Sequence, residues 1–146
     1  MSDRHRLRRT SAALGIAGVL FAVSGCSDDG SSAKATAPAT VQEVAGSKQK
    51  QITLTPEAAE RIALTTAAVA SRGGASVIPY GAVVYDADGS TWTYTATGPL
   101  SFVRTRIEVE RIEGDEAVLR QSPAAGTEVV TVGAAMLYGV ETGVGK

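Results

Sequence analysis

The stretch that best defines the fold reads Val103-Arg104-Thr105-Arg106-Ile107-Glu108-Val109-Glu110. Apolar or β-branched residues alternate with charged residues over these eight positions, which is the two-residue period of a β-strand with one buried face. Ile112 is out of phase with this alternation, so we expect the strand to bulge or end near Arg111. Glu113-Gly114-Asp115 then predicts a hairpin turn into a further strand over residues 116–121.

Short strands separated by turns continue on both sides of this stretch. We expect strands at residues 76–85, interrupted by Pro79, at 91–95 and at 128–132. Residues 51–55 and 64–69 are β-like, and 134–138 fits either a helical turn or a last short strand. Thr55-Pro56-Glu57 is typical of a helix start, so a short helix is expected over residues 56–63. The sequence therefore predicts a mainly β fold, a small antiparallel, barrel-like sheet with one short N-terminal helix.

The first 25 residues have the composition of a secretory signal. Four arginines and one Asp precede an uncharged apolar run at residues 12–23, which is shorter than a membrane-spanning helix requires. Val23-Ser24-Gly25-Cys26 resembles a bacterial lipobox, in which the cysteine is acylated through its sulfur; the alternative is a conventional signal followed by an incidental cysteine. Because several acyl chains on one residue give lasting attachment, we predict a lipoprotein anchored to the bilayer through Cys26, on the extracytoplasmic face of the cell membrane.

Reactive side chains are scarce in the 146 residues, with one His and one Cys. His5 lies in the predicted signal peptide and Cys26 is the predicted lipid attachment site. A mature chain that begins at Cys26 has neither an imidazole nor a free thiol, which excludes Ser-His-Asp triads, disulfides, and zinc or copper sites of nitrogen and thiolate ligands. We therefore expect no enzyme activity, no metal and no cofactor, since an enzyme would need carboxylates alone or a Ser–Lys pair.

Composition also bounds the organisation of the chain. The length allows one ordinary domain, and a net charge of −1 gives no reason to expect nucleic-acid binding. Residues 26–50 have few large apolar side chains and no hydrophobic periodicity, so we predict a disordered tether there. Residues 51–146 are predicted to form one small β-rich domain.

No single short motif in this chain is specific to a family, but the order in which the motifs occur resembles that of one family. The chain resembles the C-terminal membrane-proximal segment of periplasmic adaptor subunits, also called membrane fusion proteins, of tripartite efflux systems. The resemblance covers residues 51–139 and rests on Val77-Ile78-Pro79, Ala82-Val83-Val84, Asp86-Ala87-Asp88-Gly89, Trp92-Thr93-Tyr94, the strand at 103–109, and Ala125-Gly126-Thr127-Glu128-Val129-Val130.

In that family, lipoyl and α-helical hairpin domains separate two segments that are here joined by Ser71-Arg72-Gly73-Gly74 alone. The resemblance thus implies a membrane-proximal module that packs against a transporter and lacks the parts that reach the outer-membrane channel. The first functional hypothesis is an accessory lipoprotein that docks on a transporter permease. The alternative is a stand-alone surface lipoprotein that binds a small ligand or an envelope polymer.

Several side chains are candidates for partner binding. The charged face of the 103–110 strand either docks on a partner's charged surface or is a solvated face with salt bridges to neighbouring strands. The two aromatic residues of the 91–95 strand share one face, and they either pack in the core, which the scarcity of aromatics favours, or form a partner-facing patch. The candidate residues are Arg104, Arg106, Glu108, Glu110, Trp92 and Tyr94.

The sequence Asp86-Ala87-Asp88-Gly89 also looks like the start of a calcium loop. The twelfth residue counted from Asp86 is Thr97 rather than the bidentate Glu that such a loop needs. We therefore interpret these residues as a hairpin turn.

Overall fold

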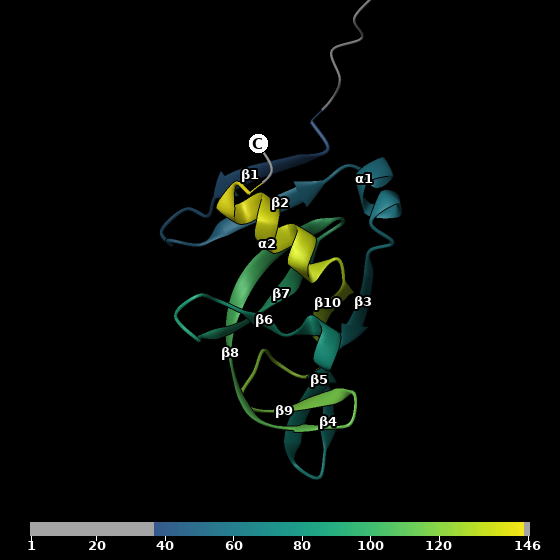
Figure 1. Cartoon of the computed structure of the whole chain (residues 1–146), viewed down its shortest axis with the longest axis vertical. Coiled ribbons are helices and arrows are strands. Elements are labelled where there is room, and N and C mark those ends of the chain that lie inside the picture. Colours follow the sequence, from purple (N-terminus) through teal and green to yellow (C-terminus); the bar gives the residue numbers. More distant parts are fainter. Residues whose placement is uncertain (1–36, 145–146) are drawn as a thin grey trace, which may run out of the picture. The chain divides into compact units, whose positions relative to one another are not determined.

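This computed structural model describes residues 37–144 (Figure 1), which belong to one compact unit. The predicted signal peptide, Cys26 and the first part of the predicted tether lie outside the described residues. The strands are β1 Ala39–Glu43, β2 Lys50–Leu54, β3 Thr65–Ala68, β4 Ala70–Arg72, β5 Ala75–Pro79, β6 Val84–Tyr85, β7 Thr91–Gly98, β8 Ser101–Glu113, β9 Glu116–Gln121 and β10 Glu128–Val132. The helices are α1 Pro56–Arg61, α2 Ala134–Thr142 and a single 3-10 turn, η1, at Tyr80–Ala82.

All the strands pair antiparallel in one curled sheet, so the mainly β, antiparallel fold class is confirmed. The strand order is β3-β10-β7-β8-β9-β5-β4, with β2 also paired to β8, β1 to β2 and β6 to β7. Val69 alone separates β3 from β4, the two ends of this path, so one continuous segment supplies both ends of the sheet. The N–H of Val69 donates to the carbonyl of Thr127 at 2.9 Å, and the carbonyl of Val69 accepts from the N–H of Gly126 at 2.9 Å.

The long strand β8 organises the sheet, as the alternation predicts. Its first half pairs with β7 on one side and β2 on the other, and its second half pairs with β9 (Figure 1). The register with β9 shifts between Glu108 and Arg111, which confirms the predicted bulge near Arg111. Because the strand bends there, one 13-residue element serves two differently oriented parts of the sheet.

Both faces of the sheet are covered by apolar side chains. Neighbouring Val129 and Val130 on β10 are fully buried in different clusters, because successive strand residues point to opposite faces. The cluster that packs against α1 and α2 includes Ile52, Tyr94, Phe102, Val130 and Leu137. The cluster on the other face includes Val69, Ile78, Ile107, Leu119 and Val129.

The predicted tether is wrong for its last part. Residues 39–43 form β1, which pairs with β2 from Ala39 opposite Leu54 to Glu43 opposite Lys50. The carbonyl of Pro38 also accepts a hydrogen bond of 3.0 Å from the N–H of Thr55. This polar strand is ordered by its pairing with β2 rather than by burial of its own side chains, a contribution that its composition does not show.

The prediction of one short N-terminal helix is right about α1 and wrong about the number of helices. Helix α1 begins where expected, with Thr55 Oγ1 accepting from the N–H of Ala58 at 3.2 Å and Pro56 in its first turn. Helix α2, at the other end of the domain, adds a second and longer helix. It follows Gly133, which has a φ of +94° and offers no side-chain cap, so the usual signal for a helix start is missing.

Candidate binding surfaces

The six candidate partner-binding residues separate into two groups in the structure. Three of them, Trp92, Tyr94 and Arg104, lie on the sheet face that α2 covers and contact one another or the helix. The other three, Arg106, Glu108 and Glu110, are exposed on the remainder of β8. The sequence does not distinguish the four charged residues, because all of them occupy the same alternating positions of one strand.

The first group is organised around Glu141, in the last turn of α2. Its side chain is only 7 % exposed, and Oε2 accepts a hydrogen bond of 2.6 Å from the Tyr94 hydroxyl. The Nε of Arg104 lies 3.2 Å from Oε1. Lys50 Nζ donates to the backbone carbonyl of Glu141 at 3.2 Å. Burial, together with the hydrogen bond to Glu141, raises the pKa of Tyr94 well above its usual range.

Arg104 connects this cluster to the β6–β7 turn. Its Nη1 lies 2.9 Å from Oδ2 of Asp86, while the Tyr138 hydroxyl of α2 donates to Oδ1 of Asp86 at 2.8 Å. The hydrogen bonds from Tyr138, from the N–H of Ala87 and from Arg104 lower the pKa of Asp86. The guanidinium carbon of Arg104 also lies 4.5 Å from the centroid of the Trp92 ring.

These contacts engage three of the six candidate residues within the domain itself. Tyr94 is fully buried and Arg104 is committed to Glu141 and Asp86, so their side chains fasten α2 to the sheet. Trp92 is partly buried and forms a cation–π contact with Arg104, and its Nε1 donates to Ser90 Oγ at 2.7 Å. Of the two interpretations of the aromatic pair, the core placement is the one found for Tyr94.

The second group lines a polar groove of about 620 Å³ beside the β6–β7 turn. Glu108 pairs with Arg120 at 3.0 Å and Glu110 with Arg111 at 2.8 Å, both in exposed positions. Arg106 forms no ion pair with any residue in the described range, and its guanidinium lies 5.4 Å from the centroid of the Trp92 ring. Glu108 and Glu110 therefore form solvated salt bridges within the domain, whereas the Arg106 guanidinium has no such partner among the described residues.

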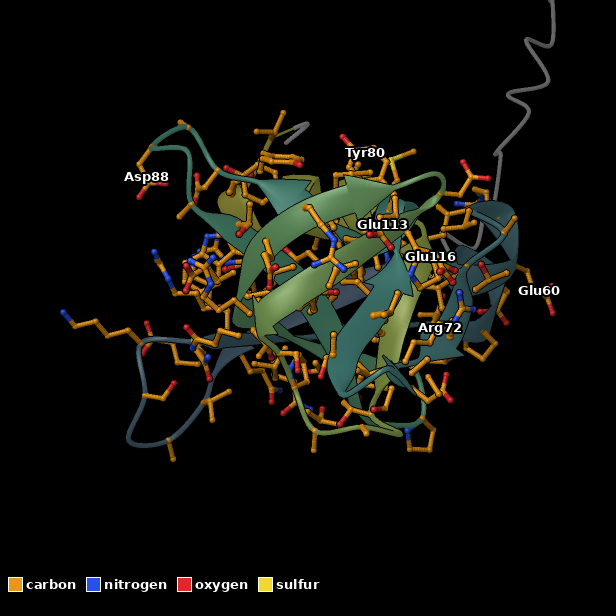
Figure 2. The ribbon with its side chains drawn as sticks, turned by 90° about the horizontal axis from the view of Figure 1, so that it is seen from below. Glu60, Arg72, Tyr80, Asp88, Glu113 and Glu116 are labelled. Atoms are coloured by element: carbon orange, nitrogen blue, oxygen red, sulfur yellow. The ribbon has the colours of Figure 1, made fainter. Side chains whose placement is uncertain are left out.

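Exposed apolar side chains border this groove. Tyr85 is 53 % exposed and Ile112 is 43 % exposed, and both line the groove. Partial burial and a hydrogen bond between the Tyr80 and Tyr85 side chains raise the pKa of Tyr85. Tyr80 is itself exposed, and its N–H donates to the carbonyl of Asp115 in the β8–β9 hairpin at 2.7 Å; Figure 2 labels it on the side of the domain away from Glu60 of α1. We call Tyr80, Tyr85, Arg106 and Ile112 the tyrosine patch.

The far edge of the sheet is fastened by a different ion pair. Arg72 on β4 pairs with Glu116 on β9, across β5, as the side chains in Figure 2 show. The Arg72 side chain is exposed and that of Glu116 is half-buried. The pair links the hairpin that carries Glu113 to the end of the sheet.

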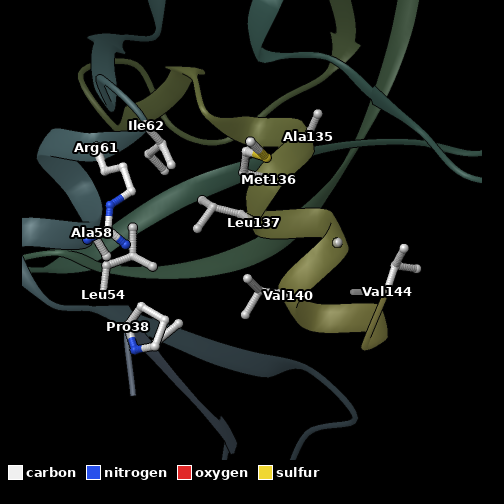
Figure 3. Close-up of a pocket in the computed structure, with 12 residues that line it drawn as sticks. Pro38, Leu54, Ala58, Arg61, Ile62, Ala135, Met136, Leu137, Val140 and Val144 are labelled. Atoms are coloured by element: carbon white, nitrogen blue, oxygen red, sulfur yellow. The ribbon is translucent and has the colours of Figure 1, made fainter. Parts of the chain in front are cut away.

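A second depression, which the sequence did not predict, lies between the two helices. It is an apolar groove of about 470 Å³ lined by both helices, β2 and the start of β1 (Figure 3). The sequence left residues 134–138 open between a helical turn and a short strand, and the structure has the longer helix α2 there, so the groove was not predicted. Ala134, Leu137 and Glu141, three and four positions apart, are buried on one side of α2, as helical spacing requires.

The calcium-loop alternative has no support in the geometry of the turn. The N–H of Gly89 donates to the carbonyl of Asp86 at 3.0 Å, and each Asp carboxylate accepts from backbone N–H groups of the turn itself. Within residues 37–144, no three Asp, Glu, His or Cys residues are grouped so that they could hold a metal ion. In the same range, neither helix has the length and apolar character needed to cross a bilayer.

Comparison with models of protein families, with curated proteins and with solved structures finds nothing that matches this chain.

Proposed function

We propose that this protein is a lipid-anchored, extracytoplasmic accessory subunit that docks on a membrane transporter permease in the manner of an efflux adaptor. The signal-like first 25 residues and the lipobox-like Val23-Ser24-Gly25-Cys26 support the anchor. The order of the β-hairpin motifs, with its resemblance to the membrane-proximal segment of periplasmic adaptors, supports the association with a transporter. The curled antiparallel sheet is compatible with such a barrel-like module.

The tyrosine patch is the observation that carries the docking proposal. Exposed aromatic residues next to an arginine are characteristic of protein–protein interfaces, in which Tyr and Arg are enriched. The patch has two exposed tyrosines, one exposed isoleucine and Arg106, which forms no ion pair with a described residue. Exposed Glu108 and Glu110 lie on the same strand and would form the polar rim of such an interface. Docking of this kind needs no chemistry from the protein itself.

Photo-crosslinking in intact membranes tests this proposal. A photoreactive amino acid is placed at Tyr85 or Ile112 of the full chain, and the matched control carries it at Glu60, on α1. We expect a permease subunit to be crosslinked from positions 85 and 112 and not from 60. Recovery of no transporter subunit from either patch position, under conditions that capture known transporter complexes, would overturn the docking proposal.

The anchor is tested separately with Cys26→Ser. We expect metabolic labelling with an alkynyl palmitate to mark the wild-type protein and not the variant, and the variant to leave the membrane fraction. Acyl labelling that persists without Cys26 would show that the anchor has been assigned to the wrong residue.

The second candidate function, a stand-alone surface lipoprotein that binds a small ligand, is favoured by one specific observation. The apolar groove between α1 and α2 has the volume of a small-molecule site. It lies on a different part of the domain from the tyrosine patch, so the two functions are separable by mutation.

A further inference from the structure

The apolar groove between the helices has walls that belong to elements distant in the sequence. Helix α1 supplies Ala58 and Arg61, and Ile62 follows it directly. Helix α2 supplies Met136 and Val140, and β2 supplies Leu54 (Figure 3). Met136 is 60 % exposed although its side chain is apolar. The groove is therefore open to a ligand from outside and is not a void closed inside the core.

The chemistry of the lining selects the kind of ligand. Every side chain that lines the groove is apolar except that of Arg61, and no hydroxyl, amide or carboxylate side chain takes part. A polar molecule or an extended peptide in this groove would lose hydrogen bonds to water and find few replacements. A hydrocarbon chain loses none, because it makes none.

Arg61 distinguishes this groove from a simple apolar patch. Among the arginines in residues 37–144, it is the one that forms neither an ion pair nor a contact over an aromatic ring with a described residue. Figure 3 shows its side chain extending from α1 toward Ala58 and Leu54. An unpaired guanidinium at the edge of an apolar groove is suited to bind a carboxylate through a bidentate, charge-assisted contact.

We infer that the groove binds a free long-chain fatty acid, with the hydrocarbon chain between α1 and α2 and the carboxylate on Arg61. This inference does not rest on the docking proposal, because the groove and the tyrosine patch share no residue. It assigns the second candidate function its class of ligand, a single-chain anionic amphiphile.

Photolabelling of the full chain tests the inference. The protein carries Cys26→Ser, so that it has no acyl chain of its own, and is mixed in solution with liposomes of a zwitterionic phospholipid. The probe is a palmitate analogue with a diazirine in its chain and a terminal alkyne. We expect the label on Met136 and Val140, and we expect dodecanoate to compete better than dodecanol or dodecyltrimethylammonium, which share its chain but lack its negative charge.

Two pairs of variants separate the site from general apolar adsorption. Arg61→Gln should lower labelling about fivefold, the size of an exposed charge contact, whereas the matched control Arg120→Gln should leave it unchanged. Met136→Glu places a carboxylate on the groove wall and should lower labelling about tenfold or more. Its control, Val132→Glu, changes an exposed apolar residue that lies outside both the groove and the tyrosine patch. Circular dichroism of each variant checks that the fold is retained.

Three outcomes would overturn the inference. Labelling of Ile112 and Val132 as strong as that of Met136 would indicate adsorption to any exposed apolar residue. Equal labelling of the Arg61→Gln and Arg120→Gln proteins would show that Arg61 does not bind the carboxylate of the fatty acid. Stronger labelling by a phospholipid that carries the same diazirine would show that the groove takes its acyl chain from the bilayer rather than from a free fatty acid.

Discussion

The Nε atom of Arg104 lies 3.2 Å from Oε1 of Glu141, and this ion pair joins the middle of the sheet to the last turn of the C-terminal helix. Arg104 is also paired with Asp86, and Glu141 also accepts from the Tyr94 hydroxyl. Two strands, one turn and one helix therefore meet in a single polar cluster. Helix α2 forms one wall of the apolar groove, so the position of that wall depends on this cluster.

Removal of the Glu141 carboxylate should destabilise the domain. Glu141→Ala leaves the positive charge of Arg104 and the buried hydroxyl of Tyr94 without this acceptor, and we expect a loss of about 2–3 kcal/mol in the free energy of unfolding. Urea unfolding at neutral pH measures it. Glu108→Ala is the matched control, because its pair with Arg120 is exposed on both sides and should contribute nothing measurable. Equal effects of the two substitutions would contradict the structural role of Glu141.

The stability of the domain should fall at alkaline pH because of Tyr94. Its pKa in the folded protein is raised above the ordinary value of 10.0, so the unfolded chain loses this proton first as the pH rises. The contribution of Tyr94 is complete below pH 10 and declines above it, by at most about 1.4 kcal/mol per pH unit.

Tyr94→Phe should remove this part of the alkaline decline. Urea unfolding at several pH values between 9 and about 11 compares the two slopes. The wild-type slope should be steeper, with the remainder due to Tyr85 and Tyr138, whose pKa values are also raised. Identical slopes for the two proteins would show that Tyr94 titrates normally.

The carboxyl group of Asp86 should titrate below its ordinary pKa of 3.8, chiefly because Tyr138 donates a hydrogen bond to it. As the pH falls, the unfolded chain binds this proton first, so the stabilising contribution of Asp86 is present above pH 3.8 and is lost as the pH approaches the lowered value. Tyr138→Phe should raise the pKa of Asp86 toward 3.8, and Tyr80→Phe should not. Carbon-13 NMR titration of the Asp86 carboxyl group measures both, and a pKa unmoved by Tyr138→Phe would be the contrary result.

Two threonines on the same face of β7 should respond in opposite directions to the same substitution. Thr93 is fully buried, and its hydroxyl has no hydrogen-bond partner among the described residues, so Thr93→Val should raise the free energy of unfolding by about 1 kcal/mol. The Thr95 hydroxyl contacts that of Thr105 at 2.9 Å and donates to the carbonyl of Val103 at 3.2 Å. Thr95→Val should therefore lower the free energy of unfolding by a similar amount. Thermal or urea unfolding of the two variants measures both changes in the free energy of unfolding. Changes of the same sign would contradict the prediction.

Much of the sheet was predictable because its signals are local. The alternation at residues 103–110 identifies β8, the phase error at Ile112 marks its bulge, and Asp86-Ala87-Asp88-Gly89 forms the expected turn. Strands β9 and β10 have the bounds predicted from the sequence. Each of these features depends on residues that are neighbours in the chain, so a short window of sequence contains the physical cause.

The parts that were missed depend on contacts between distant residues. Strand β1 is polar and largely exposed, and it is ordered by its backbone pairing with β2. Helix α2 starts at a glycine without a side-chain cap, and it is held by Glu141, whose partner Tyr94 is 47 positions away. Of the six candidate binding residues, Tyr94 and Arg104 contact Glu141 of α2, and no local sequence pattern shows these contacts.

The sequence by itself determined the strand periodicity, the turns, the start of α1 and the signal-like N-terminal segment, because backbone preference and side-chain alternation act over a few residues. Only the tertiary structure decided which side of β8 is covered, where the tyrosine patch is exposed, and that an apolar groove lies beside Arg61. The covered side of β8 and the groove depend on how α2 packs on the sheet. That packing depends on the burial of Leu137 and on the ion pair between Arg104 and Glu141, which become neighbours only when the chain has folded.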